Sequence, residues 1–247
     1  MRLVFLLLLS LALGPATPGG ARVAGKGPQR EQTRHDKFLQ DHPESASAHQ
    51  AYAEYLAEEG NLRAAIVHWR TAQLLEPRNA AIANSLGGGF LRMGKAAESA
   101  AEFRRAIALD GGNPAYHYNL ANVEFMLRHD LATAWKIDLA EVLRFALAEY
   151  REASRLAPDN IEYARSYAET FSGVPDPDWT EAEAAWKHVL ALTPRSDFVY
   201  LQLARVSLKR GDAEGTRRFL GQIVDTRHDG LKRKLQAKAD QLAAPRL

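Results

Sequence analysis

The sequence repeats a set of four landmarks at intervals of 34 residues or close to that spacing. Each copy has a small residue, an aromatic residue four positions later, a small or β-branched residue three further on, and a helix-breaking residue or glycine five beyond that. The four copies are Ala65, Trp69, Ala72 and Pro77; Ser99, Phe103, Ala106 and Gly111; Ala146, Tyr150, Ala153 and Pro158; and Ala182, Trp186, Val189 and Pro194. Spacings of four and three place residues on one face of a helix. The pattern therefore predicts a series of helices that each bury one face, in an array of stacked helix pairs.

A second set of landmarks precedes these helices. A large apolar residue is followed by a small one at Tyr52-Ala53, Leu86-Gly87, Leu120-Ala121, Tyr167-Ala168 and Leu203-Ala204. Gly60, Gly94 and Gly211 follow at the expected helix ends, where the chain often adopts a left-handed conformation that glycine tolerates best. Each unit therefore reads as helix, turn, helix. Strand-like alternation is missing, so we expect almost no sheet.

This combination resembles the tetratricopeptide repeat (TPR), a helix-turn-helix unit of 34 residues. The match runs from about Glu44 to His228, and the fifth unit, with Thr216, Leu220 and Ile223 in its second helix, departs most from the pattern. The resemblance implies an all-α fold, an α-solenoid of about five TPR-like helix pairs with a C-terminal capping helix.

In TPR proteins the first helices of successive pairs line a concave groove that binds peptides or protein segments. Asn119 is the leading candidate for this role, because the family often has asparagine at that position, in a context like Tyr118-Asn119-Leu120-Ala121. Gln50 and Glu54 stand where members that clamp a free carboxyl terminus have Lys and Asn, so recognition of a chaperone tail is not expected. The groove positions implied by the resemblance are Gln50, Glu54, Asn84, Gly88, Tyr118, Asn119, Asn122, Arg165, Glu169, Leu201, Gln202 and Arg205.

The chain starts with features of a secretory signal peptide. Met1-Arg2 is followed by an apolar run, Leu3 to Leu13, and then by small residues and prolines up to Ala21. The run is shorter than the roughly 20 residues that span a bilayer. We therefore expect residues 1–21 to be a signal peptide cleaved after Ala16 or Ala21, with an uncleaved anchor as the alternative.

Three further segments lie outside the regular repeat. Residues 22–43 are polar and are expected to form a linker with a short helix near Thr33 to Gln40. Residues 128–140 are an insertion in the third unit, too apolar and too poor in Gly and Pro for a loop. They are expected to form extra helix that either lengthens the second helix of the pair or forms a short segment of its own. The array is taken to occupy 44–228, and residues 229–247 are expected to form the capping helix that closes the last pair.

No motif in the sequence indicates catalysis or a cofactor. The chain has no cysteine, and none of its eight histidines occurs in an H-E-x-x-H arrangement, so no metal site is expected. Gly89 to Lys95 has the G-x-x-x-x-G-K spacing of a phosphate-binding loop, but Ala96 follows and the surrounding pattern is helical. We expect no enzyme activity and no bound cofactor.

The charge is unevenly distributed although the formal net charge is only +2. Residues 195–247 contain 12 Lys or Arg and 6 Asp or Glu, including Lys232-Arg233-Lys234. For an exported protein this basic end suggests contact with an anionic surface and not with nucleic acid. A solvated closing helix is the simpler interpretation.

The sequence thus predicts a non-catalytic adaptor or scaffold that binds a peptide or protein partner in its groove and is exported to the periplasm or the cell exterior. The lack of cysteine favours a bacterial periplasm or exterior over a disulfide-rich compartment. The alternative is a membrane-tethered envelope assembly factor that retains its N-terminal anchor.

Overall fold

The computed structural model describes residues 28–244, which form thirteen α-helices and one short 3₁₀ helix and contain no strand. The all-α class expected from the sequence is confirmed. The predicted signal peptide, residues 1–21, lies outside the described residues. The chain divides into two compact units, one ending at Val142 and one beginning at Leu143.

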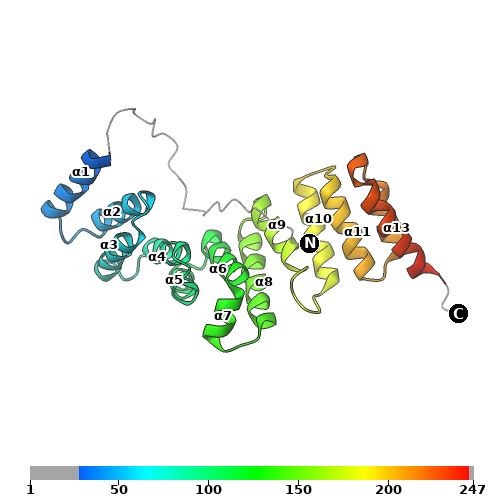
Figure 1. Ribbon diagram of the computed structural model, residues 1–247, viewed down its shortest axis with the longest axis horizontal. Coiled ribbons are helices and arrows are strands. Elements are labelled where there is room, and N and C mark those ends of the chain that lie inside the picture. The colour runs from blue at the N-terminus through cyan, green and yellow to red at the C-terminus, as the bar shows by residue number, and fades with distance from the viewer. Residues whose placement is uncertain (1–27, 245–247) are drawn as a thin grey trace. The chain divides into compact units, whose positions relative to one another are not determined.

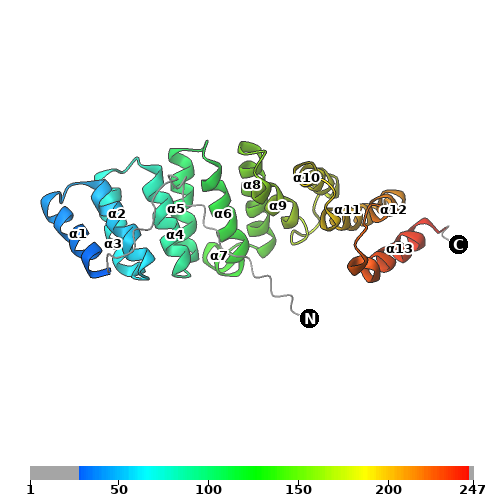
Figure 2. The ribbon, with the colours of Figure 1, turned by 90° about the horizontal axis from the view of Figure 1, so that it is seen from above.

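The first unit is built of consecutive helices that pack as neighbours. Figures 1 and 2 both show α2 beside α3 and α4 beside α5. The helices are α1 (Pro28–Asp41), α2 (Ala46–Glu58), α3 (Leu62–Leu75), α4 (Ala80–Arg92), α5 (Ala96–Leu109), α6 (Pro114–Met126) and α7 (Arg128–Trp135).

The second unit repeats this arrangement. Helix α8 (Leu139–Leu156) begins four residues before the unit boundary. The helices that follow it are α9 (Ile161–Thr170), α10 (Trp179–Leu192), α11 (Asp197–Lys209), α12 (Ala213–Gly221), the 3₁₀ helix η1 (Thr226–His228) and α13 (Asp229–Ala243). Helix α10 packs against α9 and α11, and α13 packs against α11 and α12.

Polar side chains fix where most of these helices begin. A side-chain oxygen of the N-cap residue accepts a hydrogen bond from a backbone amide of the first turn. Asn, Ser or Asp does this at Ser45, Asn61, Asn79, Asn113, Asn160, Asp178, Ser196 and Asp212. Helix α5 is different, because Lys95 stands at its N-cap and makes no side-chain cap.

The turns within pairs use glycine as expected. Gly60, Gly94 and Gly211 have φ angles of 82°, 70° and 79°. This left-handed conformation is costly for a residue with a Cβ atom. Gly94 follows helix α4, and no strand precedes the Gly89–Lys95 segment, so this segment is a helix end and not a phosphate-binding loop.

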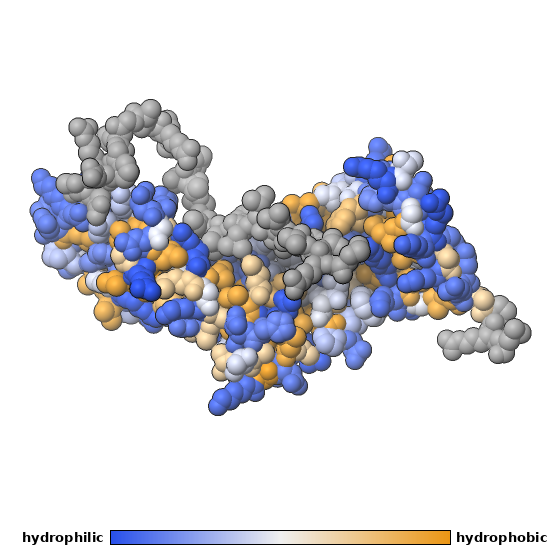
Figure 3. Space-filling view, in the orientation of Figure 1, coloured by the Kyte–Doolittle hydropathy of each residue, from blue (hydrophilic) through white to orange (hydrophobic). Residues whose placement is uncertain are grey.

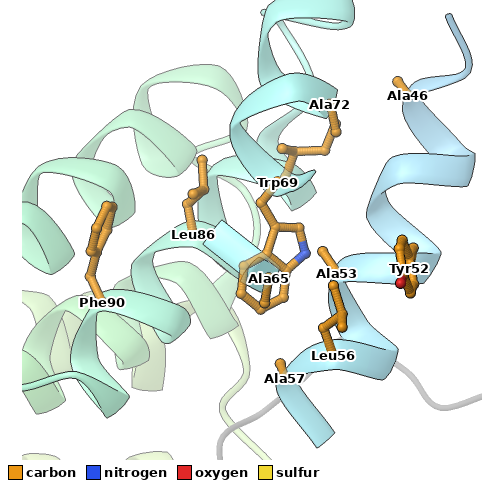
Figure 4. Close-up of a cluster of buried hydrophobic side chains, with 11 residues drawn as sticks. Ala46, Tyr52, Ala53, Leu56, Ala57, Ala65, Trp69, Ala72, Leu86 and Phe90 are labelled. Atoms are coloured by element: carbon orange, nitrogen blue, oxygen red, sulfur yellow. The ribbon is translucent and has the colours of Figure 1, made fainter. Parts of the chain in front are cut away.

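The repeated landmarks form the core. The aromatic residues Trp69, Phe103, Tyr150 and Trp186 are all buried, as the pattern predicts. Figure 4 shows Trp69 of α3 among Ala53 and Leu56 of α2 and Leu86 of α4. Trp69 thus ties α3 to both of its neighbours, α2 and α4.

Two glycines of α4 make this packing possible. A Cβ atom on Gly87 would lie 2.7 Å from the ring of Phe103, and one on Gly89 would lie 2.7 Å from the ring of Trp69. The small residue expected at position 87 is therefore required by contact with α5. The contact of Gly89 with α3 was not anticipated from the sequence.

Buried glutamates also join neighbouring helices, and the sequence pattern did not reveal them. Glu102 of α5 accepts hydrogen bonds from Arg70 (2.6 Å) and Gln73 (2.8 Å) of α3. Glu124 of α6, only 1% exposed, accepts one from Arg104 of α5 at 2.9 Å. In the second unit Glu183 of α10 pairs with Arg210 and with Lys187. Such carboxylates are tolerated in a core only when paired.

The insertion forms its own short helix, α7, one of the two possibilities that the sequence left open. It packs on α5 and α6, and Leu131 is fully buried there. The guanidinium carbon of Arg104 lies 4.1 Å from the ring centroid of Trp135, which gives this tryptophan a packing role. Lys136 ends the helix in a left-handed conformation with φ 56°.

Helix α1 is longer than the short helix expected at Thr33 to Gln40. Proline at its first position, Pro28, suits a helix start because the missing amide hydrogen would have no partner there. The ring of His35 stacks on Tyr52 and Tyr55 with centroid distances of 5.5 and 5.2 Å. Helix α1 therefore contacts α2 through His35, within the segment expected to be a linker.

Candidate functional site

The first unit places two candidate asparagines in direct contact. Asn119 of α6 donates a hydrogen bond from Nδ2 to Oδ1 of Asn84 on α4, at 2.9 Å. Asn84 is 8% exposed and Asn119 is 2% exposed. The carbonyl of Asn84 is thus occupied, while its amide group donates to none of the described residues. Asn119 offers little surface of its own and holds Asn84 in place.

Gly88 lies one turn after Asn84 on α4 and is partly exposed. A position without a side chain beside an amide is suited to close approach of another backbone. Asn84 is itself buried, so the surface that this part of α4 offers comes mainly from the backbone at Gly88.

The remaining candidates of the first unit differ in exposure. Gln50 is half-buried on α2 and donates a hydrogen bond from Nε2 to Glu54 Oε1 at 3.0 Å, one turn along the helix. Glu54 is exposed. On α6 Tyr118 is buried and Asn122 is half-buried. Gln50, Glu54 and Asn122 can reach a partner, whereas Tyr118 belongs mainly to the core.

In the second unit one candidate, Arg165, lies over an aromatic ring that is not among the predicted site residues. Arg165 of α9 donates from Nε to Glu169 Oε1 at 2.7 Å, and its guanidinium carbon lies 5.0 Å from the ring centroid of Phe198 on α11. Phe198 also packs edge-on against Trp186, at 5.8 Å. Gln202 and Arg205 follow Phe198 by four and seven residues, so all three share one face of α11. This spacing could have identified Phe198 from the sequence.

The other candidates of α11 continue this face. Arg205 is exposed and donates from Nη1 to Gln202 Oε1 at 3.2 Å. Gln202 is half-buried, and Leu201 is buried and contributes to the core. Helices α9 and α11 therefore present two guanidinium groups, one amide group and the Glu169 carboxylate that pairs with Arg165 on the second unit.

A separate polar cluster in this unit has a structural explanation. Tyr167 of α9 donates to Glu181 of α10 at 2.6 Å and accepts from Arg151 of α8 at 3.2 Å. Burial raises the pKa of Tyr167 to about 12, the hydrogen bond to Glu181 adds to the rise, and Arg151 opposes it. The tyrosine stays protonated and ties three helices together.

The described residues contain no group of three or more His, Cys, Asp or Glu side chains placed to hold a metal ion. Within 28–244 no helix is both long and apolar enough to cross a bilayer. What the candidate residues can supply is hydrogen bonds and charge to a bound polypeptide, from amide and guanidinium groups.

No family model matches the sequence, and no curated protein matches it. Solved structures do match. YrrB, described as a TPR protein with an unusual peptide-binding site, aligns over 84% of this chain and 97% of its own, with 17% identity and a TM-score of 0.64. PilF of Pseudomonas aeruginosa aligns over 85% of this chain and 90% of its own, with 18% identity and a TM-score of 0.57.

A third structure, the MamA protein, aligns over 82% of this chain and 97% of its own, with 11% identity and a TM-score of 0.58. Sequence identities this low carry information about the fold alone. Together with the helix pairs and their buried landmarks, these matches show that the chain has the TPR fold.

Proposed function

We propose that the protein is a non-catalytic adaptor or scaffold that binds an extended peptide or protein segment along the first helices of its pairs. The observation that carries this proposal is the amide pair of Asn84 and Asn119, which holds the amide group of Asn84 in a defined position beside Gly88. An extended backbone needs donors and acceptors of this kind.

The second unit supports the same function with a different chemistry. The Nη atoms of Arg165 and two of the three nitrogens of Arg205 donate to none of the described residues. Guanidinium groups recognise carboxylates through paired hydrogen bonds. We therefore expect preferred ligands to carry an acidic side chain. The peptide-binding site of YrrB supports a peptide ligand for a chain of this fold.

The test is selection of binding peptides from a random library displayed on phage, followed by measurement of Kd by isothermal titration calorimetry. Hydrogen bonds to charged groups contribute about 1.5–3 kcal/mol. Arg165→Ala and Arg205→Ala are each expected to raise the Kd for an acidic peptide by about tenfold or more. Asn84→Ala is expected to raise it somewhat less.

The matched control is Arg63→Ala with Arg78→Ala, two exposed arginines of α3 and the turn that follows it. These variants should bind the selected peptides like the wild type. Equal Kd values for the control variants and for the Arg165, Arg205 and Asn84 variants would reject the assignment of this face.

We also propose that the protein is exported, because Leu3 to Leu13 has the length and setting of a signal peptide. Mass spectrometry of the mature protein is expected to find an amino terminus at Thr17 or Arg22. An intact Met1 in the membrane fraction would favour the tethered assembly factor instead.

A further inference from the structure

We infer that the exposed side of α13 is a contact surface for an anionic lipid bilayer. The inference does not depend on peptide binding by the first helices. It rests on how the structure distributes the charges of a helix whose sequence, read linearly, mixes acids and bases.

The bases of α13 gather on its solvent side. Lys234, Lys238 and Gln241 follow one another at intervals of four and three residues, so they share one face of the helix. Arg233 lies beside this row, and all four residues are exposed. No carboxylate of the described residues forms a salt bridge with Arg233, Lys234 or Lys238. Leu235 and Ala239 form the opposite, buried face.

The one acid in the second half of the helix forms its ion pair with α12. Asp240 Oδ1 accepts hydrogen bonds from Nε and Nη2 of Arg217 on α12, at 3.0 and 2.8 Å, and from Gln236 at 3.0 Å. These hydrogen bonds lower the pKa of Asp240, and the bond from Arg217 contributes most. Its carboxylate therefore neutralises Arg217 and leaves the lysines of α13 uncompensated.

An exposed apolar residue accompanies the basic row. Leu242 is 42% exposed and lies one turn after Lys238. Val224, 86% exposed, is a separate apolar residue in the segment between α12 and η1 and is not placed on this row. Figure 3 shows hydrophilic residues over much of the visible side of α13, with hydrophobic ones among them. Basic residues beside an exposed apolar one suit the headgroup region of a bilayer.

A bilayer fits this surface better than an acidic protein does. Lysines supply point charges on flexible stems and impose little geometry. The basic row is the side of a single helix, which matches a flat and continuous layer of negative charge. Each basic residue near such a surface contributes about a fivefold gain in binding. Three residues give roughly a hundredfold, which is peripheral and reversible association.

The experiment is co-sedimentation of the full chain with vesicles of pure phosphatidylcholine and with vesicles that contain phosphatidylglycerol, at low and high salt. We expect binding to the anionic vesicles that exceeds binding to the neutral ones and falls steeply between 0.1 and about 0.5 M salt. Neutral vesicles report any contribution of the apolar run at Leu3 to Leu13, because that contribution does not need anionic lipid.

The decisive variant is Arg233→Gln with Lys234→Gln and Lys238→Gln, expected to lower the partition coefficient for anionic vesicles by about a hundredfold. The control variant removes the same charge from the first unit, by replacing the exposed Arg63, Arg78 and Lys136 with Gln. Its partition coefficient for anionic vesicles should fall much less. Circular dichroism checks that both variants keep their helix content.

Equal loss in both variants would mean that net charge alone governs binding and would overturn the assignment to α13. Absence of binding to anionic vesicles would overturn it as well. Salt-sensitive capture of polyglutamate without vesicle binding would assign the surface to an acidic polypeptide instead. If the Arg165 variant loses peptide binding but still binds vesicles, vesicle binding by α13 is independent of peptide binding by the first helices.

Discussion

Gly87 and Gly89 show how single residues set the spacing between helices. The two positions lie on different sides of α4, one against Phe103 and the other against Trp69. Glycine inside a helix costs up to about 1 kcal/mol relative to alanine. The close approach of two aromatic rings from neighbouring helices is what offsets that cost here.

Gly87→Ala is therefore expected to destabilise the protein although alanine is the better helix former. Overpacking costs about 1–3 kcal/mol, and the gain in helix propensity recovers at most about 1 kcal/mol. Urea denaturation monitored by circular dichroism measures the change in the free energy of unfolding.

The control is Gly230→Ala in α13, where an added Cβ atom would meet nothing within 4 Å. This variant should be neutral or more stable. If Gly87→Ala were as stable as Gly230→Ala, the ring of Phe103 would not constrain position 87.

At the scale of the helix, the described helices differ in whether a side chain caps their first turn. Helix α3 begins with Asn61, whose side chain accepts from the amide of Ala64, whereas α5 begins with Lys95 and has no such bond. Lys95 contacts Glu98 at 3.6 Å and lies near the ring of Phe90, both weak exposed interactions. Helix α5, like α7 and α13, thus lacks a side-chain cap that eight other described helices have.

Lys95→Asn is expected to stabilise the protein by about 0.5–1 kcal/mol, because it supplies the missing cap. The reciprocal change, Asn61→Lys, should cost about 1 kcal/mol. Thermal and urea unfolding of both variants test the pair. A loss of stability in Lys95→Asn would show that the contacts of the lysine outweigh a cap.

The helices and their buried faces could be predicted from the sequence because both follow from a short repeat. Trp69, Phe103, Tyr150 and Trp186 recur at nearly constant spacing, and the structure buries all four. Position 119 was selected by resemblance, but its burial against Asn84 depends on how α4 meets α6, which no local pattern records. Phe198 was missed because it lies outside the repeated landmarks.

At the scale of the whole molecule, the chain consists of two compact units divided after Val142. In repeat proteins each helix pair contacts only its neighbours, so stability is close to a sum over pairs and their interfaces. A local change is then felt mainly within its own unit.

This predicts that Gly87→Ala acts unevenly along the chain. Single-tryptophan versions that retain Trp69 or Trp186 report on the first and second units separately. The variant should shift the urea midpoint seen by Trp69 more than the one seen by Trp186. Identical shifts would indicate that the two units unfold as one.

The buried glutamates restrict how a chain of this kind can be shortened or rearranged. Glu124 of α6 depends on Arg104 of α5, and Glu102 of α5 depends on Arg70 of α3, yet these acids do not occupy equivalent places in their units. Excising α4 and α5 would preserve the phase of the repeat but take Arg104 away from Glu124. The helix pairs thus have similar backbones but are not interchangeable. Genetic deletion or duplication of one pair would need compensating substitutions at these acids.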